Sequence, residues 1–366
     1  MKKIFLIYLC VILAFLSGCW DQSLLVGKTL INGVSFDISE KNELVAAARI
    51  LNIESKGGGQ FELTDELIDA KGKYSSEVGP EINFKMPGKI DVSKAHVILI
   101  GEELGKKGIH PFLEIFYRPK DAYVTSRVVM TKGSATDILA VNPQKSPIAF
   151  EILKALRSSE SLTNIPRETV FSAWSQIVDP GEDLMLPFVE KAEENRVSIG
   201  GVYLFHNDKY TGYSIPKEKS TLLLLLTKGI QKEGLIALNL TRNRSTSFRV
   251  SGDNRKLDLV IDKDHRKIKC IINLEIDVNL ISYSNNFEEK TNVKTLNKDM
   301  SKLLTKEAKE LTKTLLEANC DAFGIGKKLA SSHPDVWKKL DWEKDYKNVQ
   351  FEPKVKVNIT KTGTVF

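Results

Sequence analysis

The C-terminal third of the chain has the clearest pattern of hydrophobic and polar positions. Between Lys298 and Ser331, apolar residues recur at steps of three and four, and Lys and Glu fill the positions between them. This spacing puts one apolar stripe along a helix and leaves the other side to solvent. From Phe351 to Thr360, Val and Ile alternate with Lys and Asn, the period of a half-buried strand. We therefore predict a long helix packed on a sheet that includes a final strand.

The N-terminal half has short apolar runs that alternate with helical patterns. Strands are predicted at residues 29–36, 43–53, 96–100, 122–130, 197–205 and 210–215, and helices at residues 64–70, 109–117, 134–141, 148–158 and 167–178. The helix at 64–70 is predicted from Thr64, which has the residue type of an N-cap and precedes two acidic residues. Alternating strands and helices favour an α/β or α+β layer.

The middle of the chain has a run of five leucines, Leu222 to Leu226, which indicates a buried turn of helix or strand. Pro216 is placed to begin a helix through them. Four strands are predicted after it, at residues 235–240, 246–250, 257–261 and 268–280.

The predicted fold class is α+β with two to three domains, mixed or antiparallel sheets and packed helices, because the 348 residues after position 18 exceed one ordinary core. The expected parts are a signal peptide (1–18), an N-terminal α/β domain (19–190), a strand-rich middle domain (197–256) and a sheet with the long helix (257–366).

The first twenty residues have the order that secretion and lipid attachment require. Two lysines precede an apolar run from Ile4 to Leu16, which is too short to span a bilayer but suits a signal-peptide core. Leu16-Ser17-Gly18-Cys19 matches the bacterial lipobox, so we predict cleavage before Cys19 and diacylglycerol on its sulfur. A cleaved signal with an incidental cysteine, or an uncleaved anchor, are the alternatives.

Charge and cysteine usage narrow the classes of partner. The chain has 53 Lys and Arg against 47 Asp and Glu, and this small surplus argues against nucleic acid and is compatible with an anionic membrane surface. Cys270 and Cys320 lie in apolar patterns and are expected to be buried thiols; a bridge between them is the alternative.

A search for catalytic, metal-binding or cofactor-binding residues finds none. The histidines show no pair at the one-turn helical spacing of a zinc site; they are His96, His110, His206, His265 and His333. Ser214 lacks the second glycine of a nucleophile elbow. The acidic pairs are expected at the solvated surface; they are Glu102 with Glu103, and Asp262 with Asp264. The glycines at 57–59 lack the Gly-Lys-Ser/Thr of a P-loop.

Two C-terminal features have more than one interpretation. Gly324-Ile325-Gly326 resembles part of a dinucleotide fingerprint, but Leu329 stands where a third glycine is needed, so we expect close backbone packing. Trp337 and Trp342, with the lysines around them, are expected to form either a contact with lipid or a partner, or a capped core with solvated lysines.

Several of these stretches together resemble the Ger(x)C lipoproteins, the C subunits of spore germinant receptors. The similar segments are Cys19-Trp20-Asp21, residues 96–104, residues 321–326 and Trp337, so the resemblance covers the mature chain. It implies a three-domain α+β protein without enzymatic activity or cofactors, anchored on the outer face of the inner spore membrane. It also implies assembly with two integral-membrane partners, the A and B subunits, to which germinant recognition is generally attributed.

Two other classes compete with this interpretation. A lipid-anchored solute-binding protein would deliver a small ligand to a transporter, and such proteins have two similar α/β lobes joined by a hinge. A lipoprotein hydrolase would need a catalytic constellation, and the sequence offers none.

Overall fold

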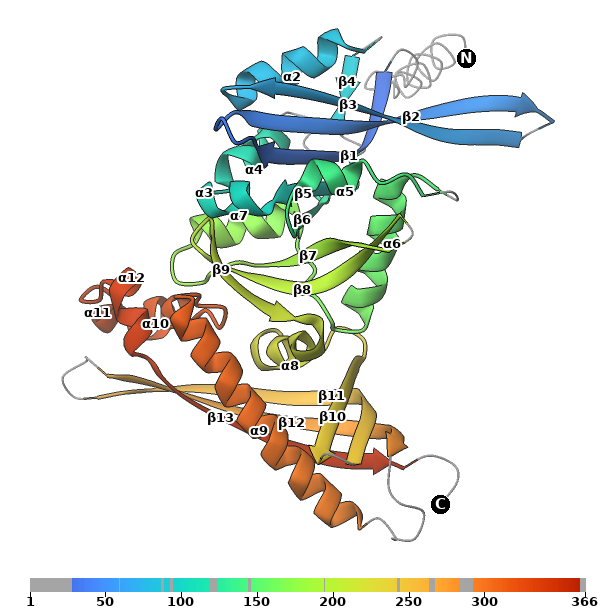
Figure 1. Cartoon of the computed structure of the whole chain (residues 1–366). Coiled ribbons are helices and arrows are strands. Elements are labelled where there is room, and N and C mark those ends of the chain that lie inside the picture. Colours follow the sequence, from blue (N-terminus) through green and yellow to red (C-terminus); the bar gives the residue numbers. More distant parts are fainter. Residues whose placement is uncertain are drawn as a thin grey trace, which may run out of the picture.

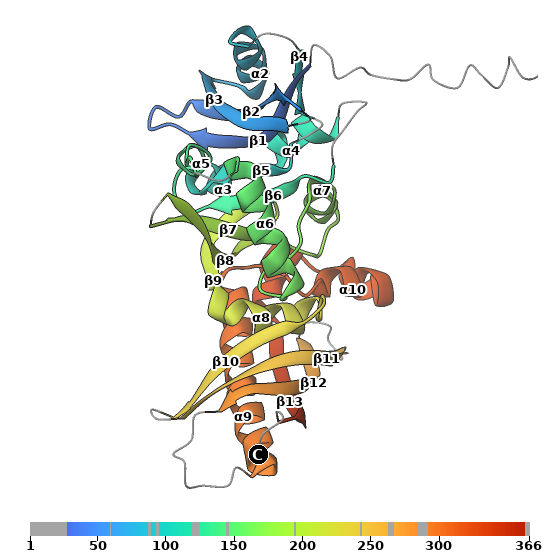
Figure 2. The same cartoon turned by 90° about the vertical axis from the view of Figure 1, so that its right-hand side faces the viewer.

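The structure is a computed structural model that describes residues 28–58, 60–86, 89–92, 95–118, 124–143, 146–193, 195–241, 244–262, 267–283 and 292–362. Two sheets follow one another along an elongated molecule (Figures 1 and 2). We call the part that holds β1 to β9 the N-terminal lobe, and the part that holds β10 to β13 the C-terminal lobe. The predicted α+β class, with mixed sheets and a long C-terminal helix, is confirmed.

The sheet of the N-terminal lobe has the strand order β3-β2-β1-β5-β6-β7-β8-β9, with β4 paired to β1. Its strands are β1 (Lys28–Ile38), β2 (Leu44–Gly57), β3 (Gln60–Gly72), β4 (Lys89–Asp91), β5 (Val97–Gly101), β6 (Arg127–Thr131), β7 (Met185–Ala192), β8 (Arg196–His206) and β9 (Lys209–Pro216). Its helices are α2 (Ser75–Phe84), α3 (Glu102–Lys107), α4 (His110–Tyr117), α5 (Ala135–Leu139), α6 (Ile148–Ser161) and α7 (Val170–Val178).

Helices cover both faces of this sheet, which explains why β5 is an unbroken apolar run. Val97 and Leu99 pack with α5 and α6, whereas Ile98 and Ile100 pack with α3, α4 and α7. All four side chains are fully buried. A strand buried on both faces needs no polar alternation, so the pattern of β5 follows from its central position.

The sheet of the C-terminal lobe has the order β10-β11-β12-β13. Its strands are β10 (Gly234–Thr241), β11 (Arg244–Ile261), β12 (Ile268–Tyr283) and β13 (Gln350–Lys361). The helices are α9 (Val293–Glu317), α10 (Ile325–Ser332), α11 (Pro334–Trp337) and α12 (Trp342–Asp345), followed by the 3-10 turn η2 (Tyr346–Asn348). The long helix α9 crosses one face of the sheet (Figure 1).

Helix α9 also covers the edge strand β13 with polar side chains one turn apart. Ser301 Oγ accepts the backbone N–H of Val357 at 2.9 Å, and Asn297 Oδ1 accepts that of Ile359 at 3.0 Å. Thr305 Oγ1 accepts the backbone N–H of a third β13 residue at 3.0 Å. These side chains satisfy donors that an open sheet edge leaves unpaired.

Helix α8 (Lys217–Thr227) lies between the two sheets (Figures 1 and 2) and explains the run of leucines. Leu222 to Leu226 are each at most 2% exposed. They belong to one apolar core with Leu204 of β8 and Phe248 of β11. A helix with apolar residues on every side must be buried on every side, and two facing sheets provide that burial. Pro216 is the residue before the first helical turn, as predicted.

Two secondary-structure predictions are wrong. Residues 64–70 are in strand β3, because the ladder that pairs β3 with β2 from Gln60 to Gly72 outweighs the N-cap signal of Thr64. The helix expected at 298–331 is interrupted, since α9 ends at Glu317 and α10 begins at Ile325. Between these two helices, Asn319 (φ 51°) and Gly324 (φ 63°) have left-handed backbone angles, which an α-helix does not continue through.

Two of the expected domain limits lie within the sheets and not between them. β8 and β9, expected in a middle domain, pair with β7 in the N-terminal sheet. The limit between residues 256 and 257 lies inside β11, which is one strand through both of the segments predicted at 246–250 and 257–261.

Within the described residues, no helix has the length and apolar character that crossing a bilayer requires.

Candidate functional site at the joint between the lobes

The loop after α7, residues 179–183, lies against residues 319–327 of the C-terminal lobe. The backbone N–H of Asp183 donates to the carbonyl oxygen of Asp321 at 3.0 Å. The backbone N–H of Lys327 donates to the carbonyl oxygen of Gly181 at 2.9 Å. The N–H of Asp321 donates in return to Asp183 Oδ2 at 2.8 Å. The segment 321–326, which the sequence singled out, is therefore one of the parts of the chain that connect the C-terminal lobe to the N-terminal lobe. We call this contact the joint.

Two glycines, Gly181 and Gly326, allow the backbones of the two lobes to approach closely at the joint. A Cβ atom on Gly326 would lie 2.6 Å from the Cα of Gly181 and 2.6 Å from Nε1 of Trp342. Real Cβ atoms do not approach backbone this closely, so the position accepts glycine only. The interpretation of Gly324-Ile325-Gly326 as a close-packing segment is confirmed.

The Asp321 carboxylate organises the start of α10. It is 1% exposed and accepts the backbone N–H groups of Ile325 at 2.9 Å and Gly326 at 2.8 Å. It also accepts the indole N–H of Trp342 at 3.1 Å. Burial raises the pKa of Asp321 to about 7, although the backbone donors act in the opposite direction. This carboxyl group thus ties α10 to α12 and orders the segment that contacts the N-terminal lobe.

His206, at the end of β8, connects Asp183 with the C-terminal lobe. Its Nδ1 lies 3.3 Å from Asp183 Oδ2, and its Nε2 lies 3.1 Å from Nδ2 of Asn319. The hydrogen bond with Asp183 raises the pKa of the His206 imidazole, and burial opposes that rise. The carboxylate of Asp183 therefore favours the protonated form of the His206 imidazole.

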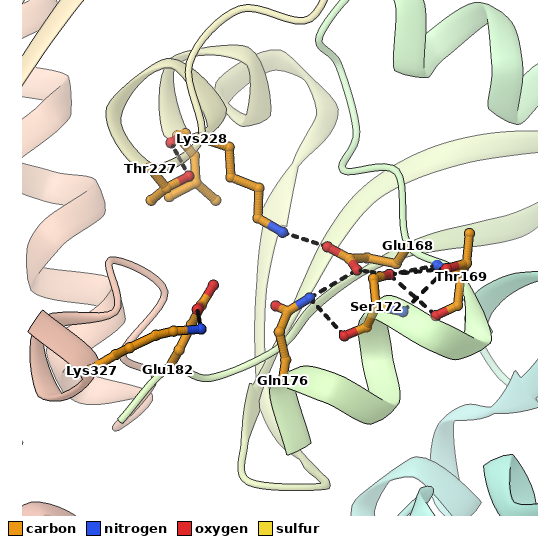
Figure 3. Close-up of polar contacts among 9 residues, drawn as sticks. Glu168, Thr169, Ser172, Gln176, Glu182, Thr227, Lys228 and Lys327 are labelled. Atoms are coloured by element: carbon orange, nitrogen blue, oxygen red, sulfur yellow. Dashed lines mark hydrogen bonds and ion pairs between the residues drawn. The ribbon is translucent and has the colours of Figure 1, made fainter. Parts of the chain in front are cut away.

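Ion pairs flank the joint on two sides, and Figure 3 shows Lys327 with Glu182 and Lys228 with Glu168. Lys327 Nζ lies 2.7 Å from Asp179 Oδ2 and 3.4 Å from Glu182 Oε2. On the other side Lys228, next to α8, pairs with Glu168, whose side chain is 1% exposed.

The second carboxyl oxygen of Glu168 is held from α7. It accepts the hydroxyl of Ser172 at 2.6 Å and the side-chain amide of Gln176 at 3.0 Å. Glu168 is therefore a buried carboxylate with complete partners, which suits a structural role.

The indoles of Trp337 and Trp342 pack on the C-terminal core with ring centroids 5.7 Å apart, while Lys338 and Lys339 are exposed. Of the two alternatives for the indoles, the structure therefore shows packing on a capped core.

Glu102, one of the acidic pair singled out above, accepts a hydrogen bond from the hydroxyl of Tyr203 at 3.3 Å.

The other sequence-predicted residues do not come together. Cys19, the predicted lipid attachment point, lies outside the described residues, as do Asp264 and His265. Among the residues the structure places, no three His, Cys, Asp or Glu side chains gather as a metal site requires. Cys270 and Cys320 are free and buried, and desolvation raises the pKa of the Cys270 thiol to about 12. Such a thiol is a poor nucleophile at neutral pH.

Sequence reasoning missed Glu168 and Asp183. Asp179-Pro180-Gly181 marked only the end of a helix, and no local pattern shows that an acidic residue after such a turn will meet a segment 138 residues away. The one sequence signal for this site was His206, a polar residue at the end of an apolar strand pattern.

Comparison with known proteins gives matches to both lobes. A family model described as the spore germination protein N-terminal domain matches residues 21–191, and one described as spore germination B3/GerAC like, C-terminal, matches residues 200–363. Spore germination protein GerQC of Bacillus cereus is 23% identical, with 95% of this chain and 96% of that protein covered. Spore germination protein A3 of Bacillus subtilis (strain 168) is 22% identical, with 99% and 98% covered.

The fold agrees with these matches. The crystal structure of the GerBC protein aligns with a TM-score of 0.57 at 18% identity, covering 90% of this chain and 97% of the other. The two family models, which together match most of the chain, define a spore germination protein. The chain belongs to the GerAC-like family, the C subunits of germinant receptors, and this is a non-enzymatic family.

Proposed function

We propose that this protein is the lipid-anchored, non-catalytic C subunit of a nutrient germinant receptor and is needed for spore germination. It works by contact with integral-membrane A-type and B-type subunits at the outer face of the spore inner membrane. The observation that carries the proposal is the pair of family models, which match residues 21–191 and 200–363. The lipobox that ends at Cys19, just before the matched region, supports the anchor.

The structure supports a contact role in a second way. The charged residues of the joint are used in internal pairs, such as Lys327 with Asp179 and Lys228 with Glu168. These ion pairs hold the two lobes in a fixed arrangement. A rigid protein of this kind is suited to binding partners through its surface.

The anchor is tested by comparing two cysteine substitutions. Cys19→Ala removes the acyl acceptor, whereas Cys10→Ala makes the same change inside the apolar run and leaves the lipobox intact. We expect mass spectrometry to find diacylglycerol on Cys19 in the wild type and in Cys10→Ala. The Cys19→Ala protein should lose the anchor, and its spores should lose germination through one receptor without a defect in vegetative growth.

Assembly is tested by purifying the acylated protein from detergent-solubilised spore membranes. Two polytopic membrane proteins should copurify with it. Recovery of the protein alone, together with unchanged germination of deletion spores across many nutrients, would refute the proposal.

The alternative of a solute-binding protein has less support. Such proteins have two similar lobes, whereas here a mixed sheet of nine strands is followed by a different sheet of four. Calorimetry of the full chain with amino acids and sugars separates the two classes, because only the solute-binding class requires tight binding of one of them.

A further inference from the structure

A polar cavity of about 520 Å³ lies beside the C-terminal half of α6 in the N-terminal lobe. Its walls are the starts of β5 and β6, the last turn of α6, the loop before α7 and the link between α8 and β10. α6 runs down toward α8 here (Figure 2). The cavity therefore sits where the N-terminal lobe meets the chain that leads into the C-terminal lobe.

Positive charge dominates the lining. Four cationic side chains line the cavity with one carboxylate, that of Glu160. Glu160 is occupied, because its two oxygens receive Nε and Nη2 of Arg127 at 2.6 and 3.1 Å. Both side chains of this pair are at most 10% exposed. The bidentate pair forms a fixed, neutral floor.

The other three cations are Arg157, Arg167 and Lys232, and their side chains have no ion pair or hydrogen bond with any other residue that the structure describes. The acidic residues next to them in sequence are used elsewhere. Glu168 pairs with Lys228, and Glu233 pairs with Arg249 at 2.9 Å. The three cations are exposed residues at the rim of the cavity, and they have no internal counterion among the described residues.

Three unneutralised cations around one cavity repel one another, and an anion between them reverses that interaction. Guanidinium groups have planar forks that match the oxygens of phosphate, and an ammonium group adds a compact charge. We propose that this cavity binds a small phosphate oxyanion carrying two negative charges. Because Arg157 and Arg167 belong to the N-terminal lobe and Lys232 to the link, the bound anion joins the two.

The test measures binding of inorganic phosphate to the full-length protein in detergent by equilibrium dialysis at constant ionic strength, with chloride replacing phosphate. The variant carries Arg157→Gln, Arg167→Gln and Lys232→Gln. The control carries Arg118→Gln, Lys313→Gln and Lys344→Gln, which remove the same charge from side chains that are 74%, 77% and 82% exposed.

We expect saturable binding of one phosphate to the wild type, at least about tenfold weaker in the cavity variant and unchanged in the control. Phosphate should also raise the melting temperature of the wild type and of the control, but not of the cavity variant. Absence of saturable binding, or an equal loss in the control, would overturn the proposal. Circular dichroism establishes that each variant is folded before binding is measured. The proposal does not depend on the receptor function, since it is tested on the purified chain.

Discussion

Asp183 and Asp321 form two reciprocal hydrogen bonds with each other across the joint. The N–H of Asp183 donates to the Asp321 carbonyl at 3.0 Å, and the N–H of Asp321 donates to the Asp183 carboxylate at 2.8 Å. Each residue also holds a neighbouring group, His206 for Asp183 and the start of α10 for Asp321. Mutations at this pair and its neighbours should therefore affect the contact between the lobes first.

Gly326→Ala should destabilise the protein. Exchange of Gly for Ala inside a helix usually stabilises by about 0.5–1 kcal/mol, but here the new Cβ would meet the backbone of Gly181, and overpacking of this kind costs about 1–3 kcal/mol. Denaturant unfolding measures the change. Gly252→Ala is the control, because its Cβ would have its nearest neighbour at 3.7 Å. Equal stability of Gly326→Ala and the wild type would contradict the tight joint.

Asp321→Ala should cost at least about 2 kcal/mol of unfolding free energy, because it leaves two buried backbone N–H donors and one part-buried indole N–H donor without their acceptor. One of these donors is the indole of Trp342, so the tryptophan fluorescence of the folded state should also change. Asp335→Ala removes an exposed carboxylate nearby and is expected to alter neither quantity. A silent Asp321→Ala would show that the segment is ordered by other contacts.

The stability of the joint should fall as the pH rises. The pKa of Asp321 is raised from 3.8 to about 7 and that of His206 is raised above 6.5, so the folded state binds both protons more tightly than the unfolded chain. The contribution of Asp321 is complete below pH 3.8 and is lost by about pH 7. That of His206 is complete below pH 6.5 and is lost as the pH passes its raised pKa.

Thermal unfolding at a series of pH values measures this dependence. His206→Gln should make the loss of stability above pH 6.5 shallower, whereas His333→Gln, at an exposed position, should leave the profile of the wild type. A profile that His206→Gln does not change would assign the dependence to other groups.

Ser301→Ala should loosen the edge of the C-terminal sheet. The backbone N–H of Val357 loses its acceptor, which costs about 1–3 kcal/mol when the donor stays buried. Hydrogen exchange of the Val357 amide should become faster, with a smaller effect at the far end of β13. Ser331→Ala, on the exposed side of α10, is the comparison.

Much of the fold could be predicted because its signals are local. The alternation in β13, the stripe of α9 and the apolar run of β5 each follow from which faces are buried. Thr64 misled because an N-cap residue type also occurs in strands, and only the partner β2 decides between them. The break after Glu317 was missed because apolar spacing continues through it, while the left-handed angle of Asn319 leaves no periodic signature.

The joint could be predicted only in part. Glycines at 324 and 326 signalled close packing, but the surface they approach, at Gly181, is set by the tertiary fold. The cavity cations also lie far apart in sequence, from Arg157 to Lys232, so their meeting depends on how the link passes α6.

The placement of α8 has a mechanical consequence. Since its five leucines touch both sheets, swinging the lobes apart would bring them into water, at a cost on the order of 10 kcal/mol. A displacement of one lobe is thus transmitted to the other lobe, because the two move together as a nearly rigid body.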